Sequence, residues 1–372
     1  MYNNKIEMQK SISFKQSLLS LLFIFISCAC ADAQTYSSPE SVEFDYANNR
    51  WFISNNGNGQ ILTRSSATGA LAVFATGIPS GPHGLEIVSD TLYVCDGGTL
   101  KAYDINTATQ VFNISLGASF LNGITHDNNG YLYITDFSGY KIYRFNTADR
   151  TFSVYVSNTG TSSPNGIIFD AANNRCIYVN WGSNAPIKAV DLSNGTVSTI
   201  TSTTLGSCDG IASDLNGNYY VSSWSGGNKI TRFSNNFTTS TAVLTTGLSN
   251  PADIFYNVLT DTLGVPNSGS GNNTAYYYFG TSSAVNEIGD AGFHLKSFVQ
   301  NGILQVEYTL PEIAPVTLTI YDPLGRVLDA TTIDNAMKGS HIWSSSKIAV
   351  GCLSVVLKSK NVFLKSRVLL VQ

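Results

Sequence analysis

The sequence predicts an all-β protein, a six-bladed β-propeller followed by a small C-terminal β-sandwich. A four-residue motif returns six times at intervals of 39 to 44 residues. Each interval holds short segments of alternating aromatic and β-branched residues, which are typical of strands. The period stops near residue 281, where the composition changes. These three observations predict six similar sheets and then a separate domain.

Composition excludes several classes of protein. The chain has 372 residues, of which 43% are hydrophobic and 12% are charged, and it contains 32 glycines. That much apolar surface is incompatible with a wholly disordered chain. The net charge is -4, and no basic run interrupts the repeats. We therefore expect no nucleic-acid partner.

The first 33 residues are typical of an export signal. Three lysines precede an apolar run at residues 18–26, and Ala31-Asp32-Ala33 offers small residues for cleavage. The run is shorter than the roughly 20 residues that span a bilayer. We expect a signal peptide over residues 1–33, no transmembrane helix, and an exported protein, secreted or attached to the cell surface. A retained anchor and acylation of Cys28 are the alternatives.

Cleavage would leave four cysteines, Cys95, Cys176, Cys208 and Cys352. Their wide, irregular spacing matches neither a zinc site nor a dense disulfide framework. We expect small core residues, although one disulfide remains open after export.

The repeat motif sets the propeller's period. Its six copies are Pro39-Glu40-Ser41-Val42, Pro82-His83-Gly84-Leu85, Leu121-Asn122-Gly123-Ile124, Pro164-Asn165-Gly166-Ile167, Cys208-Asp209-Gly210-Ile211 and Pro251-Ala252-Asp253-Ile254. A period of this length indicates a propeller or a solenoid.

The third unit illustrates the order of strands within each repeat. It predicts strands at residues 122–126, 131–135, 141–145 and 151–156, with a turn at 127–130. One such unit cannot bury both of its faces, whereas six arranged radially pack on one another. The propeller is expected over residues 34–280. The sixth unit shows no clear fourth strand, and we expect residues 34–37 to supply it and close the ring.

A linker at residues 281–293 precedes a C-terminal domain at residues 294–372. Residues 316–322 alternate with period two into a turn at 323–326, which indicates a hairpin. Further strands are expected at residues 353–357 and 362–370.

This C-terminal domain resembles the sorting domain of the Bacteroidetes type IX secretion system. The resemblance is carried by Tyr321-Asp322-x-x-Gly325-Arg326-Val327, Gly339-Ser340-His341, Ala349-Val350-Gly351 and a basic final strand. It implies that the type IX secretion machinery is a partner through residues 294–372 and that the protein reaches the outer membrane or the medium. Cys352-Leu353-Ser354 departs from the aromatic-rich strand of that family. An accessory sandwich without a sorting role is the alternative.

The second position of each repeat motif is expected to face the central channel at one mouth. Its occupants are Glu40, His83, Asn122, Asn165, Asp209 and Ala252, with Asp253 beside the last. Carboxylates and amide carbonyls on converging strands suit a hard divalent cation such as calcium. The alternative is a polar, hydrated channel without a bound ion. His83 is either an acid or base beside the site or a hydrogen-bonded structural residue.

The repeat region resembles the gluconolactonase, or senescence marker protein (regucalcin), family of six-bladed calcium-dependent lactonases. Glu40-Ser41-Val42-Glu43-Phe44-Asp45 is similar to that family's first-blade motif, and Asn165-Gly166 and Asp209-Gly210 are similar to its metal-ligand motifs. The resemblance implies that Glu40, Asn165 and Asp209 bind the metal and that Asp209 is also the general base. It also implies that Asn122 orients the substrate or reaches the metal through water. His83, from its own chemistry, is a further candidate for substrate binding. Ser119 and Phe120 stand where the family has a substrate-binding arginine.

Two functions follow from these patterns. The first is an exported, metal-dependent hydrolase of the lactonase type, acting on a small lactone or sugar-derived substrate. The second is a non-catalytic propeller that binds a glycan or protein at the cell surface. A streptogramin-lyase-like propeller is a further alternative, although such proteins commonly have seven blades. No nucleophile elbow or phosphate-binding loop is present to support other hydrolytic chemistry.

Overall fold

A computed structural model of the chain describes residues 34–127, 129–214, 216–279, 287–288, 294–300, 303–321, 327–343, 351–359 and 362–370. These residues are almost all in strands and turns. Their helical segments are two short 3₁₀ turns, η1 (Asn56–Asn58) and η2 (Ala171–Asn173). No helix in the described ranges is long and apolar enough to cross a membrane. The predicted signal peptide, with Cys28 and Cys30, lies outside these ranges.

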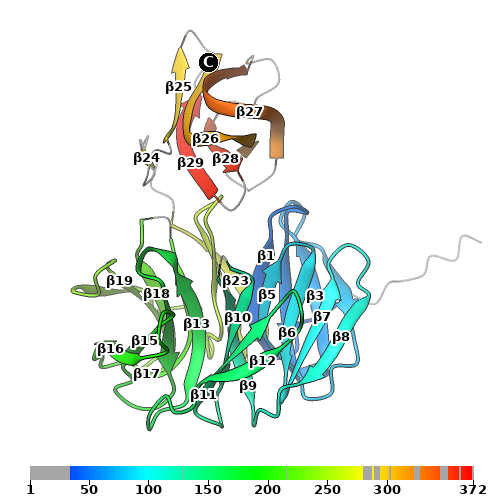
Figure 1. The fold of residues 1–372 in the computed structure, drawn as a ribbon, viewed down its shortest axis with the longest axis vertical. Coiled ribbons are helices and arrows are strands. Elements are labelled where there is room, and N and C mark those ends of the chain that lie inside the picture. The colour runs from blue at the N-terminus through cyan, green and yellow to red at the C-terminus, as the bar shows by residue number, and fades with distance from the viewer. Residues whose placement is uncertain are drawn as a thin grey trace, which may run out of the picture. The chain divides into compact units, whose positions relative to one another are not determined.

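Six antiparallel sheets follow one another along the chain, five with four strands and one with three (Figure 1). In chain order their strands are β1 Pro39–Asp45, β2 Arg50–Asn55, β3 Gln60–Ser65 and β4 Leu71–Ala75; β5 Pro82–Val88, β6 Thr91–Asp96, β7 Thr99–Asp104 and β8 Gln110–Ser115; β9 Leu121–His126, β10 Tyr131–Asp136, β11 Lys141–Asn146 and β12 Phe152–Val156; β13 Pro164–Asp170, β14 Arg175–Asn180, β15 Ile187–Asp191 and β16 Val197–Thr201; β17 Gly206–Ser213, β18 Tyr219–Ser225, β19 Lys229–Phe233 and β20 Ser240–Leu244; and β21 Phe255–Asn257, β22 Thr262–Asn267 and β23 Asn273–Tyr278.

The sheets form a closed ring of six blades. Each innermost strand contacts the next, from β1 through β5, β9, β13 and β17 to β21, and β21 returns to β1. The prediction of a six-bladed propeller is confirmed.

The prediction that residues 34–37 close the ring as a fourth strand is wrong. Ser37 instead donates its backbone N–H to Asn55 Oδ1 and accepts a hydrogen bond from Gly57 N, so this segment is held on the edge of blade 1. Within the described residues, the sixth blade keeps three strands. The ring closes at the channel, where Asp253 N donates to the Glu40 carbonyl at 2.8 Å.

The propeller core lies between the blades. Six clusters of buried side chains each combine residues from two neighbouring blades; Phe52, Ile61, Leu85 and Leu92, for example, join blades 1 and 2. Because successive side chains of a strand point to opposite faces of the sheet, each strand presents one row of apolar side chains to each neighbouring blade. Cys95, Cys176 and Cys208 are buried in these clusters as free thiols, as predicted for small core residues.

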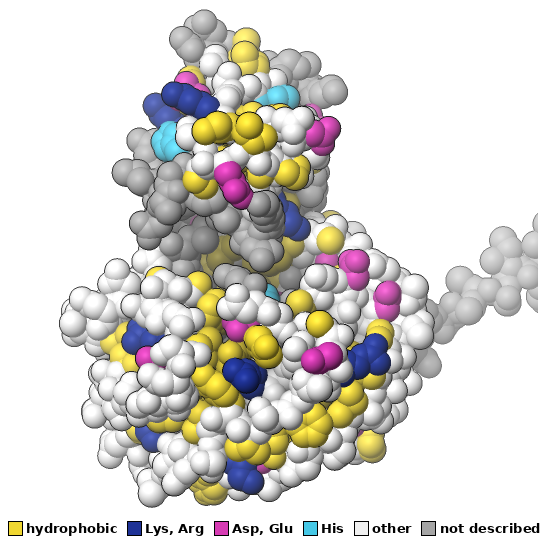
Figure 2. Space-filling model, in the orientation of Figure 1, with side chains coloured by type: hydrophobic (Ala, Val, Ile, Leu, Met, Phe, Trp, Pro, Cys, Tyr) yellow, Lys and Arg dark blue, Asp and Glu magenta, His cyan; other side chains and the backbone are white. Residues whose placement is uncertain are grey.

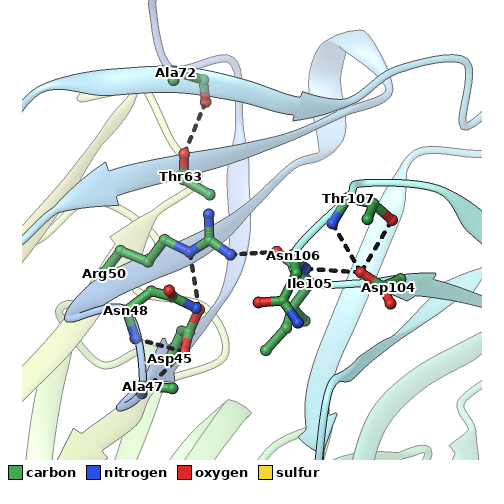
Figure 3. Close-up of polar contacts among 10 residues, drawn as sticks. All are labelled: Asp45, Ala47, Asn48, Arg50, Thr63, Ala72, Asp104, Ile105, Asn106 and Thr107. Atoms are coloured by element: carbon green, nitrogen blue, oxygen red, sulfur yellow. Dashed lines mark hydrogen bonds and ion pairs between the residues drawn. The ribbon is translucent and has the colours of Figure 1, made fainter.

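The same Asp–Arg ion pair occurs at the end of the innermost strand in two blades. In blade 1, Asp45 accepts hydrogen bonds from the backbone and side chain of Asn48 and pairs with Arg50 at 2.9 Å. Arg50 also donates to the Ile105 carbonyl of blade 2 (Figure 3). Blade 4 repeats the pair between Asp170 and Arg175, at 2.8 Å. The same spacing of Asp, Asn and Arg thus gives the same side-chain contacts in both blades.

The C-terminal strands enclose a core of their own. They are β24 Glu287–Ile288, β25 His294–Gln300, β26 Ile303–Tyr321, β27 Val327–Trp343, β28 Gly351–Ser359 and β29 Val362–Leu370. The register of β26 shifts between Thr309 and Val316, and its two halves take β25 and β28 as separate partners beside β27. Both halves bury alternate side chains in one cluster, as a small sandwich requires. The turn at 322–326 and residues 349–350, which carry part of the sorting-domain resemblance, lie outside the described residues.

The visible surface bears few charged side chains (Figure 2). Neutral groups cover most of that face, in keeping with a charged content of 12%.

A candidate metal centre at one mouth of the channel

The repeat motif forms a bulge in each of the first five innermost strands. The pairing with the second strand shifts between Pro39 and Val42, between Pro82 and Leu85, and at the same place in blades 3 to 5. A bulge leaves its residue out of the ladder and re-aims the side chain. The side chain at the second position of the motif is therefore released from the alternation by which the strand's other side chains point to one neighbouring blade or the other. We call this end of the channel the motif mouth.

Glycine at the third position lets neighbouring motifs approach closely. A Cβ on Gly123 would lie 2.5 Å from the Asn165 carbonyl oxygen, and one on Gly166 would lie 2.6 Å from that of Asp209. A Cβ on Gly210 would lie 2.5 Å from Ile254 N. The glycines thus form a collar in which each blade's motif rests on the next.

The collar changes where the ring closes. Blade 1 has Ser41 and blade 6 has Asp253 at the glycine position, and the Ser41 hydroxyl donates to Asp253 Oδ2 at 2.8 Å. The same hydroxyl accepts a hydrogen bond from Leu85 N. A side-chain contact therefore links blades 6, 1 and 2 at this seam.

Two amide oxygens at the motif mouth are buried without a hydrogen-bond partner. They are Asn122 Oδ1 and Asn165 Oδ1, on side chains of residues that are only 5% and 2% exposed. Asn165 uses its amide N–H groups on Asp209 Oδ1 and the Cys208 carbonyl, both at 3.3 Å. Buried acceptors normally find a donor or a cation. This arrangement leaves two carbonyl oxygens available to a positive ligand.

Three carboxyl groups share the same region and resist ionisation together. Burial, then the neighbouring Asp253, raises the pKa of Glu40 to about 8. Burial raises the pKa of Asp253 to about 7. Burial, then Glu40 and Asp253, raises the pKa of Asp209 well above its usual range. A cation among these groups would relieve their mutual repulsion.

His83 stands apart from this set. Its Nδ1 lies 3.0 Å from the Gly81 carbonyl, which only accepts, so Nδ1 carries the proton and Nε2 accepts from the Asn56 amide at 3.1 Å. Burial lowers the pKa of His83 to about 4, which keeps the ring neutral near pH 7. Both ring nitrogens are thus engaged in structural hydrogen bonds.

The donor set fits a hard cation better than a soft one. No group of three or more His, Cys, Asp and Glu side chains in metal-binding geometry occurs among the described residues. The set at the motif mouth consists instead of carboxyl oxygens and amide carbonyl oxygens, the ligands that calcium prefers. Glu40, Asn165, Asp209 and Asn122 are brought to one mouth, whereas Ala252 offers no donor.

Sequence reasoning missed an arc of aromatic rings beside this mouth. His83, Phe120, Phe137, Trp181 and Trp224 contact one another in series, with ring centroids 4.6 to 6.0 Å apart. Trp224 Nε1 donates to the Pro251 carbonyl at 3.0 Å, which fixes its ring next to the sixth motif. The available signal was positional, because these aromatic residues share one repeat position at the end of the second strand: Phe137 and Trp181 directly follow β10 and β14, and Trp224 is the next-to-last residue of β18.

Comparison with protein families gives a match over this region. The sequence model of the SMP-30/gluconolactonase/LRE-like region matches residues 58–257, more than half of the chain. The chain belongs to this family. The matched residues include five of the six second positions of the motif, His83, Asn122, Asn165, Asp209 and Ala252, whereas Glu40 lies before them. A comparison with curated proteins gives no match.

Solved structures similar to this family member share its fold at low sequence identity. A Bacteroides thetaiotaomicron protein of unknown function has a TM-score of 0.58 and 12% identity, over 66% of this chain and 70% of its own. Regucalcin from Agrobacterium tumefaciens, described as a calcium-binding protein, has a TM-score of 0.51 and 17% identity, over 63% and 83%. A luciferin-regenerating enzyme has a TM-score of 0.50 and 13% identity, over 63% and 85%. These likenesses show the propeller fold.

Proposed function

We propose that this family member is an exported hydrolase of the lactonase type that uses a divalent cation, most simply calcium. The observation that carries the proposal is the donor set of the motif mouth. The carboxyl groups of Glu40 and Asp209 stand near two buried amide oxygens that have no partner. Such a set costs free energy unless a cation binds it.

Glu40, Asn165 and Asp209 are the residues that would hold the cation. When bound, the cation polarises an ester carbonyl and lowers the pKa of a nearby water. The candidate substrate is a small lactone or sugar-derived ester. Asn122 would orient it with its amide, and the neutral ring of His83 would contact it from blade 2.

Asp209 is the proposed general base. Without a cation, burial and then Glu40 and Asp253 raise its pKa. The ionised form of Asp209, which a bound cation would favour, is the form that accepts a proton. It takes the proton of the attacking water as the new C–O bond forms. The ring C–O bond of the lactone then breaks, and the proton passes to the departing oxygen.

Calorimetric titration of the chelator-treated protein tests the site. We expect calcium to bind with a Kd on the order of 10⁻⁶ to 10⁻⁴ M. Asp209→Asn and Asn165→Ala should each abolish that binding. Glu43→Gln, an acid-to-amide change on the same strand as Glu40 but three residues away, is the matched control and should leave it intact. Equal calcium affinity in the parent protein and the three variants, or no binding in any of them, would refute the assignment. Manganese and zinc are then titrated as competing ions.

A binding function without catalysis is favoured by one observation, the aromatic arc. Half-buried rings offer large apolar contact area at little entropic cost, as ligand-binding surfaces do. In that case a glycan would bind at the motif mouth, and the cation would serve to hold the blades. Glycan binding that Trp181→Ala weakens, without turnover of any lactone, would select this function.

We further propose export through the type IX secretion machinery, with residues 1–33 as signal peptide and residues 294–372 as sorting domain. The sequence resemblance supports this. Deleting residues 294–372 should leave the propeller inside the outer membrane. Undiminished secretion of the truncated chain, measured by cell fractionation, would exclude this role.

A further inference from the structure

The opposite mouth of the channel contains a cavity that the proposed hydrolytic site does not use. Its volume is about 300 Å³, and it is lined by residues of all six blades, from the last positions of the repeat motif onward. We call this end the opposite mouth. Its polar lining comes from Glu43, Glu86, Thr125 and His126 on blades 1 to 3 and from Ser213 and Asp253 on blades 5 and 6.

Glu43 is the unusual group in this cavity. The residue is only 7% exposed, lines the cavity, and has neither a hydrogen bond nor an ion pair to its carboxyl among the described residues. Glu86, in contrast, pairs with His126 Nδ1 at 2.6 Å. The Asp253 carboxyl already accepts from Ser41. A buried carboxyl without a partner is costly, so its place at a cavity wall indicates a ligand that supplies the positive charge.

The cavity has two unlike walls. Blades 1 to 3 contribute Glu43, Glu86 and the Thr125 hydroxyl, which are acceptors for N–H donors. Blades 4 to 6 contribute a wall that is apolar apart from Ser213 and Asp253 and includes Ile168, Phe169 and Phe255. A metal ion needs oxygen ligands on several sides, whereas this wall offers a hydroxyl and a carboxyl that already accepts from Ser41. A cation with an apolar body matches both walls.

We propose that the opposite mouth binds a small amphipathic organic cation, a primary ammonium group carrying an aromatic or aliphatic body. The ammonium group would donate to Glu43, Glu86 and Thr125, and its apolar body would lie against blades 4 to 6. The aromatic rings of blades 4 to 6 would contact the carbon atoms next to the ammonium group, which carry part of its positive charge, as well as the apolar body. This site uses none of the proposed metal ligands, Glu40, Asn165 and Asp209, and Asp253 lies between the two sites.

Isothermal titration of the full-length protein with phenethylammonium tests the proposal. The neutral analogue 2-phenylethanol and the smaller methylammonium serve as probes of charge and of the apolar body. We expect phenethylammonium to bind at least 10-fold more tightly than either. Glu43→Gln keeps the shape of the side chain but removes its charge, and it should weaken phenethylammonium binding at least 10-fold.

Glu40→Gln is the matched control, because it makes the same change on the same strand at the motif mouth. It should abolish calcium binding and leave phenethylammonium binding unchanged. Circular dichroism verifies that both variants are folded, and Glu86→Gln provides a second variant on the same wall. Absence of phenethylammonium binding, equal affinity for 2-phenylethanol, or an undiminished affinity in Glu43→Gln would overturn the proposal.

Discussion

The two mouths of the channel use acidic residues in different ways. At the motif mouth, backbone bulges and a collar of glycines draw the strands together around Glu40, Asp209 and two partnerless amide oxygens. At the opposite mouth the strands leave a cavity of about 300 Å³, and Glu43 faces it without a partner. The same innermost strand, β1, supplies both glutamates. Local packing therefore decides whether a carboxyl belongs to a compact oxygen-donor set or to the wall of a pocket.

The largest effect should come from filling the glycine collar. In Gly210→Ala the new Cβ would lie 2.5 Å from Ile254 N and 2.6 Å from Asp253 Cα. These are backbone atoms and cannot rotate away, so the strands must separate. We expect a loss of stability on the order of 3 kcal/mol, with calcium binding lost as well. Thermal unfolding of the chelated protein measures the first effect.

Gly271→Ala is the control for that substitution. A Cβ on Gly271 would meet its nearest neighbour, Ser249 Cβ, at 3.4 Å, an ordinary contact. This variant should unfold close to the parent temperature. If Gly210→Ala proves equally stable, the collar does not define the motif mouth.

Much of this comparison was predictable from the sequence. A motif with a constant glycine and a varying polar neighbour predicted the blades and the residues of the motif mouth, because a period repeats the same backbone geometry. The departures arise where the period breaks. Ser41 and Asp253 replace glycine at the seam, and their contact, together with the backbone bond between Asp253 and Glu40, closes the ring in place of a strand from residues 34–37.

The opposite mouth could not be predicted in the same way. Glu43 and Glu86 occupy one repeat position, but its other occupants are Thr125, Ile168, Ala212 and Phe255. Such a mixture shows no chemical pattern along the sequence. The cavity depends on side-chain volumes summed over six blades, and the Glu86–His126 pair joins residues 40 positions apart. These are tertiary properties that no single motif carries.

An intermediate effect is expected from pH. Glu40 has a folded pKa of about 8 and Asp253 one of about 7, both raised above their ordinary values. The folded state therefore binds more protons than the unfolded state between about pH 4 and pH 8, and stability falls as pH rises through this window. Without cation, we expect the unfolding temperature to drop by several degrees, on the order of 5 °C, between pH 5 and pH 8.

Calcium separates the contributions of the two mouths. Because it favours ionised carboxylates, calcium should stabilise the protein more at pH 8 than at pH 5. Burial, then Glu86 and Asp253, also raises the pKa of Glu43 well above its usual range. Glu40→Gln should therefore flatten the pH profile and remove the calcium effect, whereas Glu43→Gln should flatten the profile and keep the calcium effect. Differential scanning calorimetry at pH 5 and pH 8, with and without calcium, measures the pH effect and the calcium effect for both variants. A calcium response that is the same at both pH values would contradict the assignment of these carboxyls to a cation site.

The smallest effect should come from the ion pair at the opposite mouth. Burial disfavours the charged form of His126, but the charge and hydrogen bond of Glu86, with Asp127 nearby, outweigh it and raise the pKa of His126. The pair therefore stabilises the fold fully below the unfolded pKa of His126, and its contribution disappears as pH rises through the raised folded value. The His126 side chain is 38% exposed, so water and salt screen the pair.

We expect His126→Gln to cost about 0.5 kcal/mol at pH 5.5 in low salt, the range of a screened ion pair. The cost should approach zero at pH 9, and it should also shrink in 1 M sodium chloride, whose Debye length is about 3 Å. Urea unfolding at the two pH values measures the difference, with Glu40→Gln as a background that removes one of the titrating carboxyls of the motif mouth. A cost that persists at pH 9 would mean that His126 supports the opposite mouth by packing, and the electrostatic contrast between the two mouths would then rest on Glu43 alone.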